Sequence, residues 1–329
     1  MTKPNIRTYV RLPLFKVGSV LLLTNRKPKK MKKILLLALM LSAAFMAEAQ
    51  SLTIAPKMQK GDKKMYKTET VTSMSDQDNI AVTVETAYTV ADKTADGYVI
   101  DIKTTSVSNN ADANNTMGRI LAISSEMMKD VTVRIATDKN GQLTKVLNYD
   151  EVKNKIQGGS QKLVDELFNS APEIAQLVPK EAMLSQITDA MTEENIINSL
   201  KNADSPLALN GKTVMTGAVD EYTNGSNIKM KRTYFVKGNT VMGTSVMNME
   251  KDDIKKLIIA QVEKLVPDQA DMIKENIDTV MESGLVKLEA NEKSTYELGA
   301  DGWVKTIKTE QVSNTMGEET KATITVTQM

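Results

Sequence analysis

The feature that most constrains the fold is a repeated stretch. Residues 95–109, ADGYVIDIKTTSVSN, recur near the C-terminus as residues 300–314, ADGWVKTIKTEQVSN, with ten of fifteen aligned positions identical. In both copies an Asp-Gly pair supplies a tight turn, and an aromatic residue, Tyr98 or Trp303, then begins the period-two alternation of a half-buried strand. Each copy therefore predicts the second strand of a β-hairpin.

The N-terminal region has the pattern of an export signal. Within residues 31–49, two lysines precede an apolar run over residues 34–46, and small residues lead to a cleavage site after Ala49. The apolar run is shorter than the roughly 20 residues of a spanning helix. We expect cleavage after Ala49, export to the periplasm or the extracellular space, and no transmembrane helix in the mature chain. Residues 1–30 are interpreted as an upstream, disordered extension.

Charge and composition exclude several classes of function. Removing residues 1–49 takes ten basic residues and one acidic residue from totals of 42 and 41, which leaves 32 and 40 and a net charge of −8. An acidic chain with few aromatic residues argues against nucleic acid as a partner. The chain has no Cys and no His, so it has no disulfide, no thiolate or imidazole metal ligand and no cysteine to carry a lipid anchor.

The order of strand and helix patterns predicts a single α+β domain over residues 50–329. Alternating segments rich in Thr and Val, separated by turn residues, predict strands within residues 65–107, 131–147, 213–249 and 285–326. Apolar residues at helical spacing predict helices at 116–129, in several pieces within 150–203, and as a pair within 254–281. We expect Gly158 and Gly159 to interrupt the middle helical region.

These elements predict a long, curved, half-barrel-like antiparallel sheet with helices packed on one face. The repeat suggests internal duplication into halves 50–203 and 204–329, although shared Thr and Val composition is the alternative explanation. In the second copy Lys305 takes the place of Ile100. Because a lysine on a dry face is costly, we expect the second copy to lie near an edge or an open mouth of the sheet.

No motif for catalysis or for cofactor or metal binding occurs in the sequence. It has no G-x-S-x-G, no H-E-x-x-H, no phosphate-binding glycine loop and no dinucleotide fingerprint. We therefore predict no catalytic, cofactor-binding or metal-binding residues. A hydrolase that uses two carboxylates stays open as the least favoured alternative, because such a pair is recognised only in three dimensions.

Methionine is the one unusual component, with 21 Met against 4 Phe and 1 Trp. Flexible thioethers fill irregular cores, and they also line surfaces that adapt to apolar ligands. Ordinary core filling is the simpler interpretation. If an apolar ligand binds, the residues expected to line its site are Tyr98, Met117, Met127, Met128, Met183, Met191 and Trp303.

Several short motifs carry a resemblance to a family. They are the signal ending in AEAQ, the G-D-x-x-x-Y at Gly61 to Tyr66, the paired strand motifs within residues 88–100, and G-x-L-T-K-V-x-N-Y-D-E-V at Gly141 to Val152. The chain resembles a family of uncharacterised exported proteins of Gram-negative bacteria, and this resemblance implies export. The order of elements is also similar to that of the half-barrel of periplasmic lipoprotein carriers, an analogy of fold that cannot establish function.

Two functional hypotheses follow, from different classes. The first is a non-enzymatic exported protein that binds or carries an apolar small molecule or lipid. The second is a structural or protein-interaction module of the cell envelope, whose Thr-rich segment 320–327 would lie at a sheet edge and pair with a strand of another envelope protein.

Overall fold

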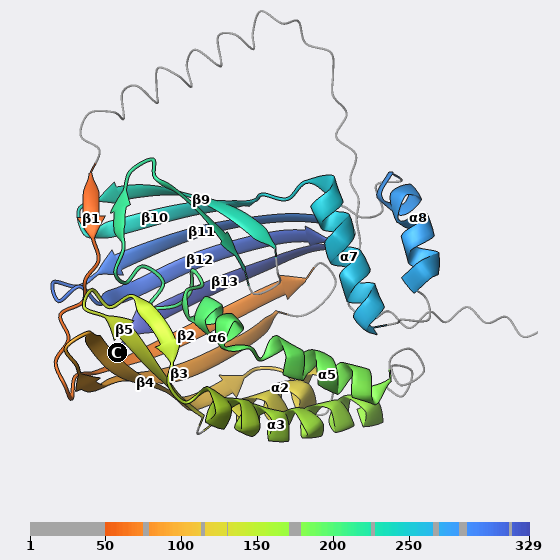
Figure 1. Ribbon diagram of the computed structural model, residues 1–329, viewed down its shortest axis with the longest axis horizontal. Helices are drawn as coiled ribbons and strands as arrows, with labels where there is room; N and C mark the ends of the chain where they lie inside the picture. The colour runs from red at the N-terminus through yellow and green to blue at the C-terminus, as the bar shows by residue number, and fades with distance from the viewer. Residues whose placement is uncertain are drawn as a thin grey trace, which may run out of the picture.

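The computed structural model describes residues 50–329 except 75–78, 113–115, 130, 171–178, 225–227, 266–269, 283–287 and 316–317. The predicted signal peptide and basic extension lie outside the described residues. The fold is mixed α+β, built on one large antiparallel sheet and several helices, as the sequence predicts (Figure 1).

The main sheet has eleven strands in the order β6-β5-β4-β3-β2-β13-β12-β11-β10-β9-β8. The strands of its first part are β2 (Lys63–Met74), β3 (Ile80–Lys93), β4 (Gly97–Asn109), β5 (Thr132–Asp138) and β6 (Leu143–Val146). Those of its second part are β8 (Val219–Thr223), β9 (Lys229–Lys237), β10 (Thr240–Met247), β11 (Leu288–Leu298), β12 (Val304–Thr315) and β13 (Glu318–Gln328). The sheet is open, with β6 and β8 at its edges. A separate two-stranded sheet pairs β1 (Ser51–Thr53) with β7 (Thr213–Met215).

Both copies of the repeat form the second strand of a hairpin, which confirms that prediction. The first copy is β4, paired with β3, and the second is β12, paired with β11. The copies also hold equivalent positions, because the order β5-β4-β3-β2 is repeated along the sheet as β13-β12-β11-β10. Direct pairing of β2 with β13 joins the two sets into one continuous sheet.

The prediction that the second copy lies near an edge is wrong. β12 lies between β11 and β13 inside the sheet, whereas β4 is only two strands from the β6 edge. Lys305 is exposed because the register shifts in β12: Val304 pairs with Leu298 and Thr306 with Glu297, which leaves Lys305 as the extra residue of a β-bulge. In the first copy the shift falls on the partner strand β3 instead, so Ile100 stays on the inner face and is fully buried.

The C-terminal strand is also placed differently from the expectation. β13 lies near the middle of the sheet, where it pairs with β12 on one side and β2 on the other. The backbone hydrogen-bonding groups on both sides of β13 are therefore paired within the sheet. The strand cannot pair with a strand of another protein, as an edge strand could.

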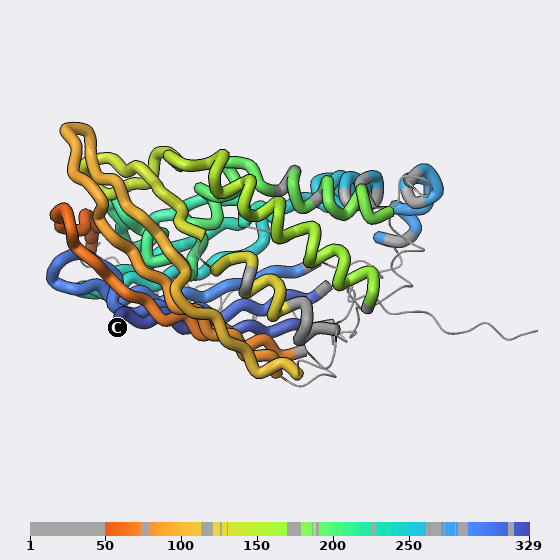
Figure 2. Tube along the Cα trace, turned by 90° about the horizontal axis from the view of Figure 1, so that it is seen from below, coloured from red at the N-terminus to blue at the C-terminus, as the bar shows by residue number. Residues whose placement is uncertain are grey.

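Six helices lie within the described residues: α2 (Thr116–Met128), α3 (Tyr149–Ser170), α5 (Lys180–Ala190), α6 (Glu193–Leu200), α7 (Lys251–Leu265) and α8 (Ala270–Glu282). The part of the predicted helical region at 171–178 lies outside the described residues. Figure 2 shows α3 running alongside α2, and these two helices contact β5 and β4 respectively. Gly158 and Gly159 do not interrupt the helix as predicted, because α3 continues through both. None of the helices in the described ranges has the length and hydropathy needed to cross a membrane.

An irregular segment fills one end of the curved sheet. Residues 205–210 are all buried, and Leu207 and Leu209 belong to one hydrophobic core with buried residues from both parts of the sheet, including Ile100 of β4 and Val241 of β10. Strands far apart in the sheet order therefore share one core with this segment. The helix that precedes this segment, α6, is joined to the edge strand β6, because its Glu193 accepts a hydrogen bond from the Val146 amide at 2.9 Å.

Candidate functional site

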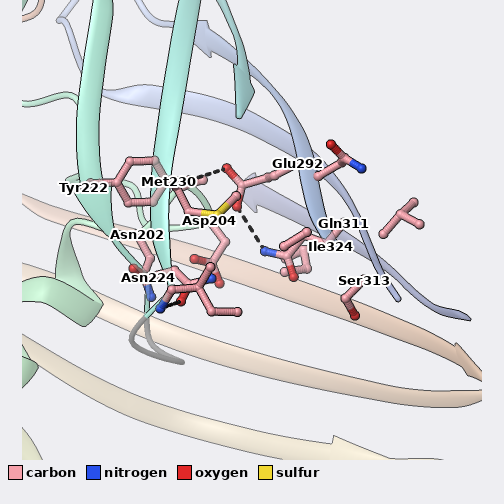
Figure 3. Close-up of a pocket in the computed structure, with 14 residues that line it drawn as sticks. Asn202, Asp204, Tyr222, Asn224, Met230, Glu292, Gln311, Ser313 and Ile324 are labelled. Atoms are coloured by element: carbon pink, nitrogen blue, oxygen red, sulfur yellow. Dashed lines mark hydrogen bonds between the residues drawn. The ribbon is translucent and has the colours of Figure 1, made fainter. Parts of the chain in front are cut away.

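A cavity of about 340 Å³, which we call the acidic cavity, lies beside the residues that precede the irregular segment 205–210 (Figure 3). Its polar lining includes Asn202, Asp204, Tyr222, Asn224, Glu292 and Gln311. Its apolar lining includes Ala203, Ile228, Met230, Val312 and Ile324. These residues come from the 202–204 segment, from strands β8, β9, β11, β12 and β13, and from the connection between β8 and β9. The cavity therefore lies between the sheet and the segment after α6.

A buried ion pair forms one wall of the acidic cavity. Arg232 of β9 donates from Nη2 to Oε1 of Glu292 on β11 at 2.9 Å, and the two residues are 3% and 8% exposed. Arg232 Nε also donates to Ser245 Oγ of the intervening strand β10 at 3.0 Å. Strand alternation places all three side chains on the inner face, since Arg232 and Glu292 both lie level with Ser245 in the strand register.

Further hydrogen bonds hold Glu292 in place. Its Oε1 accepts from Tyr222 Oη at 3.2 Å, and its Oε2 accepts from Gln311 Nε2 at 3.2 Å (Figure 3). The Arg232 guanidinium carbon lies 4.3 Å from the centroid of the Tyr222 ring, which adds a cation–π contact. Glycine at position 243 leaves room for this arrangement, because a Cβ there would lie 3.0 Å from Arg232 Cδ.

Asp204 is the second carboxylate of the cavity. Burial raises the pKa of Asp204 above its usual value, and the nearby charge of Glu292 raises it further, against the opposing effects of its own backbone amide and of Arg232. In the described part of the chain no cation forms an ion pair with Asp204. The cavity therefore holds one carboxylate neutralised by Arg232 and another that lacks such a partner.

The hydrolase alternative requires two carboxylates in one site. The structure brings Asp204 and Glu292 to one cavity, so a candidate pair of acids exists. However, a general base needs a free lone pair of adequate basicity, whereas Glu292 is paired with Arg232 and accepts hydrogen bonds on both oxygens. This environment favours a fixed anion that organises the cavity wall. No group of three or more acidic side chains that could hold a metal ion occurs within the described ranges.

A second hollow lies between the helices, and we call it the α2–α3 groove. It has a volume of about 630 Å³ and is lined by Ala122, Ile123, Met127, Lys129, Val131, Lys155, Gly158, Gly159 and Lys162. This volume lies within the range of about 300–1,000 Å³ that is typical of small-molecule sites. All the charged residues among these are lysines, and the Nζ of one of them, Lys155, also lies 3.9 Å from Glu151 Oε1. The groove lining thus combines apolar surface with ammonium groups.

Two adjacent glycines of α3 shape the groove in different ways. A Cβ at Gly159 would lie 2.2 Å from Met127 Cγ, so this glycine permits the close approach of α2 and α3. A Cβ at Gly158 would meet nothing within 4 Å. Packing therefore explains the absence of a side chain at Gly159 but not at Gly158, where the missing side chain leaves the groove open.

The residues predicted to line an apolar site do not gather in one place. Met127 lines the α2–α3 groove. Trp303 is 1% exposed within the core, and Tyr98 packs against the same core with Lys93 Nζ 5.6 Å from its ring centroid. Met191 also packs on the core, and its carbonyl accepts a hydrogen bond from Tyr149 Oη at 2.7 Å.

The other three predicted residues belong to α2 and α5. Met128 is exposed at the end of α2, and Met183 is partly buried on α5. The side chain of Met117 lies outside the described residues, although its backbone belongs to α2. Of the seven predicted residues, Met127 alone is found in the described lining of either hollow.

The sequence prediction missed the residues of the acidic cavity, although one signal was available. Met230, Arg232, Tyr234 and Val236 alternate with exposed residues, so an arginine occupies an inward position of β9. Glu292 occupies the same kind of position beside Ser294 and Tyr296 of β11. Opposite charges at inward positions of two strands indicate a buried ion pair. Asp204 has no such signal, because it lies in an irregular segment.

Comparison with known proteins adds a distant likeness of fold. No family model and no curated protein matches the chain. A solved structure described as "lipid–protein interactions in lipovitellin" matches with a TM-score of 0.40 and 8% sequence identity, and the match covers 82% of this chain and 25% of that chain. The chain thus spans about a quarter of the lipovitellin chain. At this TM-score the likeness carries no argument about function, and the proposals that follow rest on the chain's own residues.

Proposed function

We propose that the protein is an exported, non-enzymatic carrier of an anionic amphiphile such as a fatty acid. The observation that carries this proposal is the α2–α3 groove, whose apolar lining suits an acyl chain and whose lysines suit a carboxylate or phosphate head. The proposal differs from the sequence hypothesis in its site, because only Met127 of the predicted lining belongs to the groove.

The apolar part of the groove supplies the binding energy in this proposal. Ala122, Ile123, Met127 and Val131 present aliphatic and thioether surface, and each buried methylene of a ligand contributes about 0.8 kcal/mol. Methionine adapts its shape to a flexible chain because it is unbranched and polarizable.

The lysines of the groove supply selectivity. The groove lysines are Lys129, Lys155 and Lys162, and they lie on a chain that is otherwise acidic. The full sequence has 42 basic and 41 acidic residues; without residues 1–49 it has 32 and 40, a net charge of −8. Lysine stems can cover apolar surface while the ammonium groups stay in water. An anionic head at the rim would interact with these ammonium groups while its chain lies between the helices.

Titration with cis-parinaric acid, whose fluorescence rises in apolar surroundings, tests the proposal. We expect saturable binding by the wild-type protein and binding at least about tenfold weaker for Gly158→Leu, a difference of about 1.4 kcal/mol. The new side chain fills the groove from a position that is open in the structure. Because leucine also favours helix more than glycine does, this variant should fold at least as stably as wild type.

The matched control is Asn154→Leu, which adds the same side chain to an exposed position of α3 outside the groove lining. It should bind cis-parinaric acid as wild type does. The methyl ester of the probe tests the lysines separately, since it keeps the chain and removes the charge. Equal binding by wild type and Gly158→Leu would refute the groove as the site.

Export is the second part of the proposal and needs its own test. The sequence supports it through the signal-like segment ending at Ala49. Gln50, the expected first residue of the mature chain, already belongs to the fold: its backbone carbonyl accepts from the Thr216 amide at 3.1 Å and its side chain accepts from the Gly238 amide at 3.2 Å. N-terminal sequencing of protein from the periplasm and culture medium should begin at Gln50. Recovery from the cytoplasm with residues 31–49 intact would contradict export.

A further inference from the structure

We propose that the acidic cavity is a second binding site, separate from the α2–α3 groove, and that it takes a small organic cation, a primary ammonium group on a short apolar body. The two hollows share no lining residue. The two proposals can therefore be tested independently of each other.

The charged side chains around the acidic cavity determine which charge a bound ligand should carry. Asp204 and Glu292 both belong to its described lining, and that lining contains no lysine or arginine. Arg232 lies behind the wall, 3% exposed and bonded to Glu292. Arg232 offsets one of the two carboxylates, so the charge of Asp204 is left to attract a cation.

The hydrogen-bonding groups suit an ammonium donor. Glu292 Oε2 accepts a single hydrogen bond among the described residues, from Gln311 Nε2, and a carboxylate oxygen can accept another. Gln311 uses its Nε2 in that bond, which leaves its amide oxygen to accept from a ligand. Asp204 adds two more acceptor oxygens. An ammonium group carries three donors, and these three side chains provide acceptors for them in one cavity.

The remaining lining suits a short apolar body. Ile228, Met230, Val312 and Ile324 present apolar surface next to the carboxylates. A volume of about 340 Å³ is near the lower end of the range for small-molecule sites, about 300–1,000 Å³. The cavity is thus suited to a compact amine, whereas the groove is larger and positively charged.

Methionine methyl NMR tests the inference and separates the two sites. Met230 lines the acidic cavity and Met127 lines the groove, and each signal can be assigned from a Met→Leu variant. Titration of the protein, labelled with ¹³C at the methionine methyl groups, with n-hexylammonium should shift the Met230 signal saturably and leave Met127 unchanged. Neutral n-hexanol, which keeps the apolar body, should bind at least about tenfold more weakly.

The matched variant is Asp204→Asn, which keeps the shape of the side chain and removes its charge. We expect its dissociation constant for n-hexylammonium to rise at least about tenfold, with an unchanged Met230 signal in the free protein as evidence that it folds. Equal affinity for n-hexanol and n-hexylammonium in the wild-type protein, or the absence of any Met230 shift, would overturn the inference without any variant. Neither result would affect cis-parinaric acid binding in the groove.

Discussion

Arg232 and Glu292 are joined across an intervening strand. They lie on β9 and β11, and the guanidinium reaches past Ser245 of β10 to the carboxylate, with 2.9 Å between Nη2 and Oε1. Both side chains are buried, so neither charge has water to replace its partner. This pair fixes one wall of the acidic cavity and gives the first prediction.

Glu292→Ala should destabilise the protein strongly, because it leaves the Arg232 charge buried without a partner. Loss of one member of a buried pair typically costs about 3–5 kcal/mol. The double variant Arg232→Met/Glu292→Leu should recover most of this loss, since a well-packed apolar pair avoids the desolvation penalty. Urea unfolding measures both. Glu297→Gln, at an exposed position of the same strand, is the control and should change stability by less than about 0.5 kcal/mol.

Alanine at the two adjacent glycines of α3 should have opposite effects. Gly158→Ala should stabilise the protein by up to about 1 kcal/mol, because alanine favours helix and its Cβ meets nothing within 4 Å. Gly159→Ala should destabilise it by about 1–3 kcal/mol, because its Cβ would overlap Met127 and force α2 away from α3. Thermal unfolding of the two variants compares them directly, and destabilisation of equal size at both positions would contradict the packing described.

The raised pKa of Asp204 predicts a pH-dependent difference between wild type and Asp204→Asn. The folded-state pKa lies above the ordinary value of 3.8. At a pH between the ordinary pKa and the raised pKa of Asp204, the folded protein keeps a proton that the unfolded chain releases. The free energy of unfolding therefore falls as pH rises from the lower of these pKa values to the higher. Asparagine does not titrate. The free energy of unfolding of Asp204→Asn, minus that of wild type, should therefore increase as pH rises above 3.8 and then level off. A difference that is constant with pH would show that the carboxyl pKa is not raised.

Positions 100 and 305 are equivalent in the two copies of the repeat, and exchanging their residues tests the bulge in β12. Lys305→Ile should change stability by less than about 0.5 kcal/mol, because position 305 points to solvent. Ile100→Lys should prevent stable folding or cost more than about 4 kcal/mol, because position 100 is fully buried in the hydrophobic core. Circular dichroism during urea unfolding measures both, and a large effect of Lys305→Ile would show that the side chain faces the interior.

The strands and most helices were predictable because local patterns determine them. Turn residues and period-two alternation gave the hairpins of β3 with β4 and of β11 with β12. The sequence could not show which strand of a hairpin takes the extra residue of a bulge, because that depends on packing across the sheet. The same residue pattern therefore buries Ile100 and exposes Lys305. The sequence predicts a helix break at Gly158 and Gly159, but contacts between α2 and α3 override the low helix propensity of glycine.

The candidate sites were less predictable than the fold. The acidic cavity joins Asp204, in an irregular segment, to strands more distant in sequence, and no local pattern records that approach. The central position of β13 likewise depends on its pairing with β2, far away in the sequence. Met127 was identified because helix periodicity placed it on an apolar face, and this is the kind of information that sequence carries well.

Photo-cross-linking tests the fatty-acid proposal most directly. The protein is irradiated with a fatty acid that carries a diazirine on its chain, and the modified peptides are identified by mass spectrometry with and without excess unlabelled fatty acid. The proposal predicts that competition removes label from the peptides that contain Met127 and residues 155–162. Label that resists competition, or that concentrates on β8 to β13 around the acidic cavity, would contradict it.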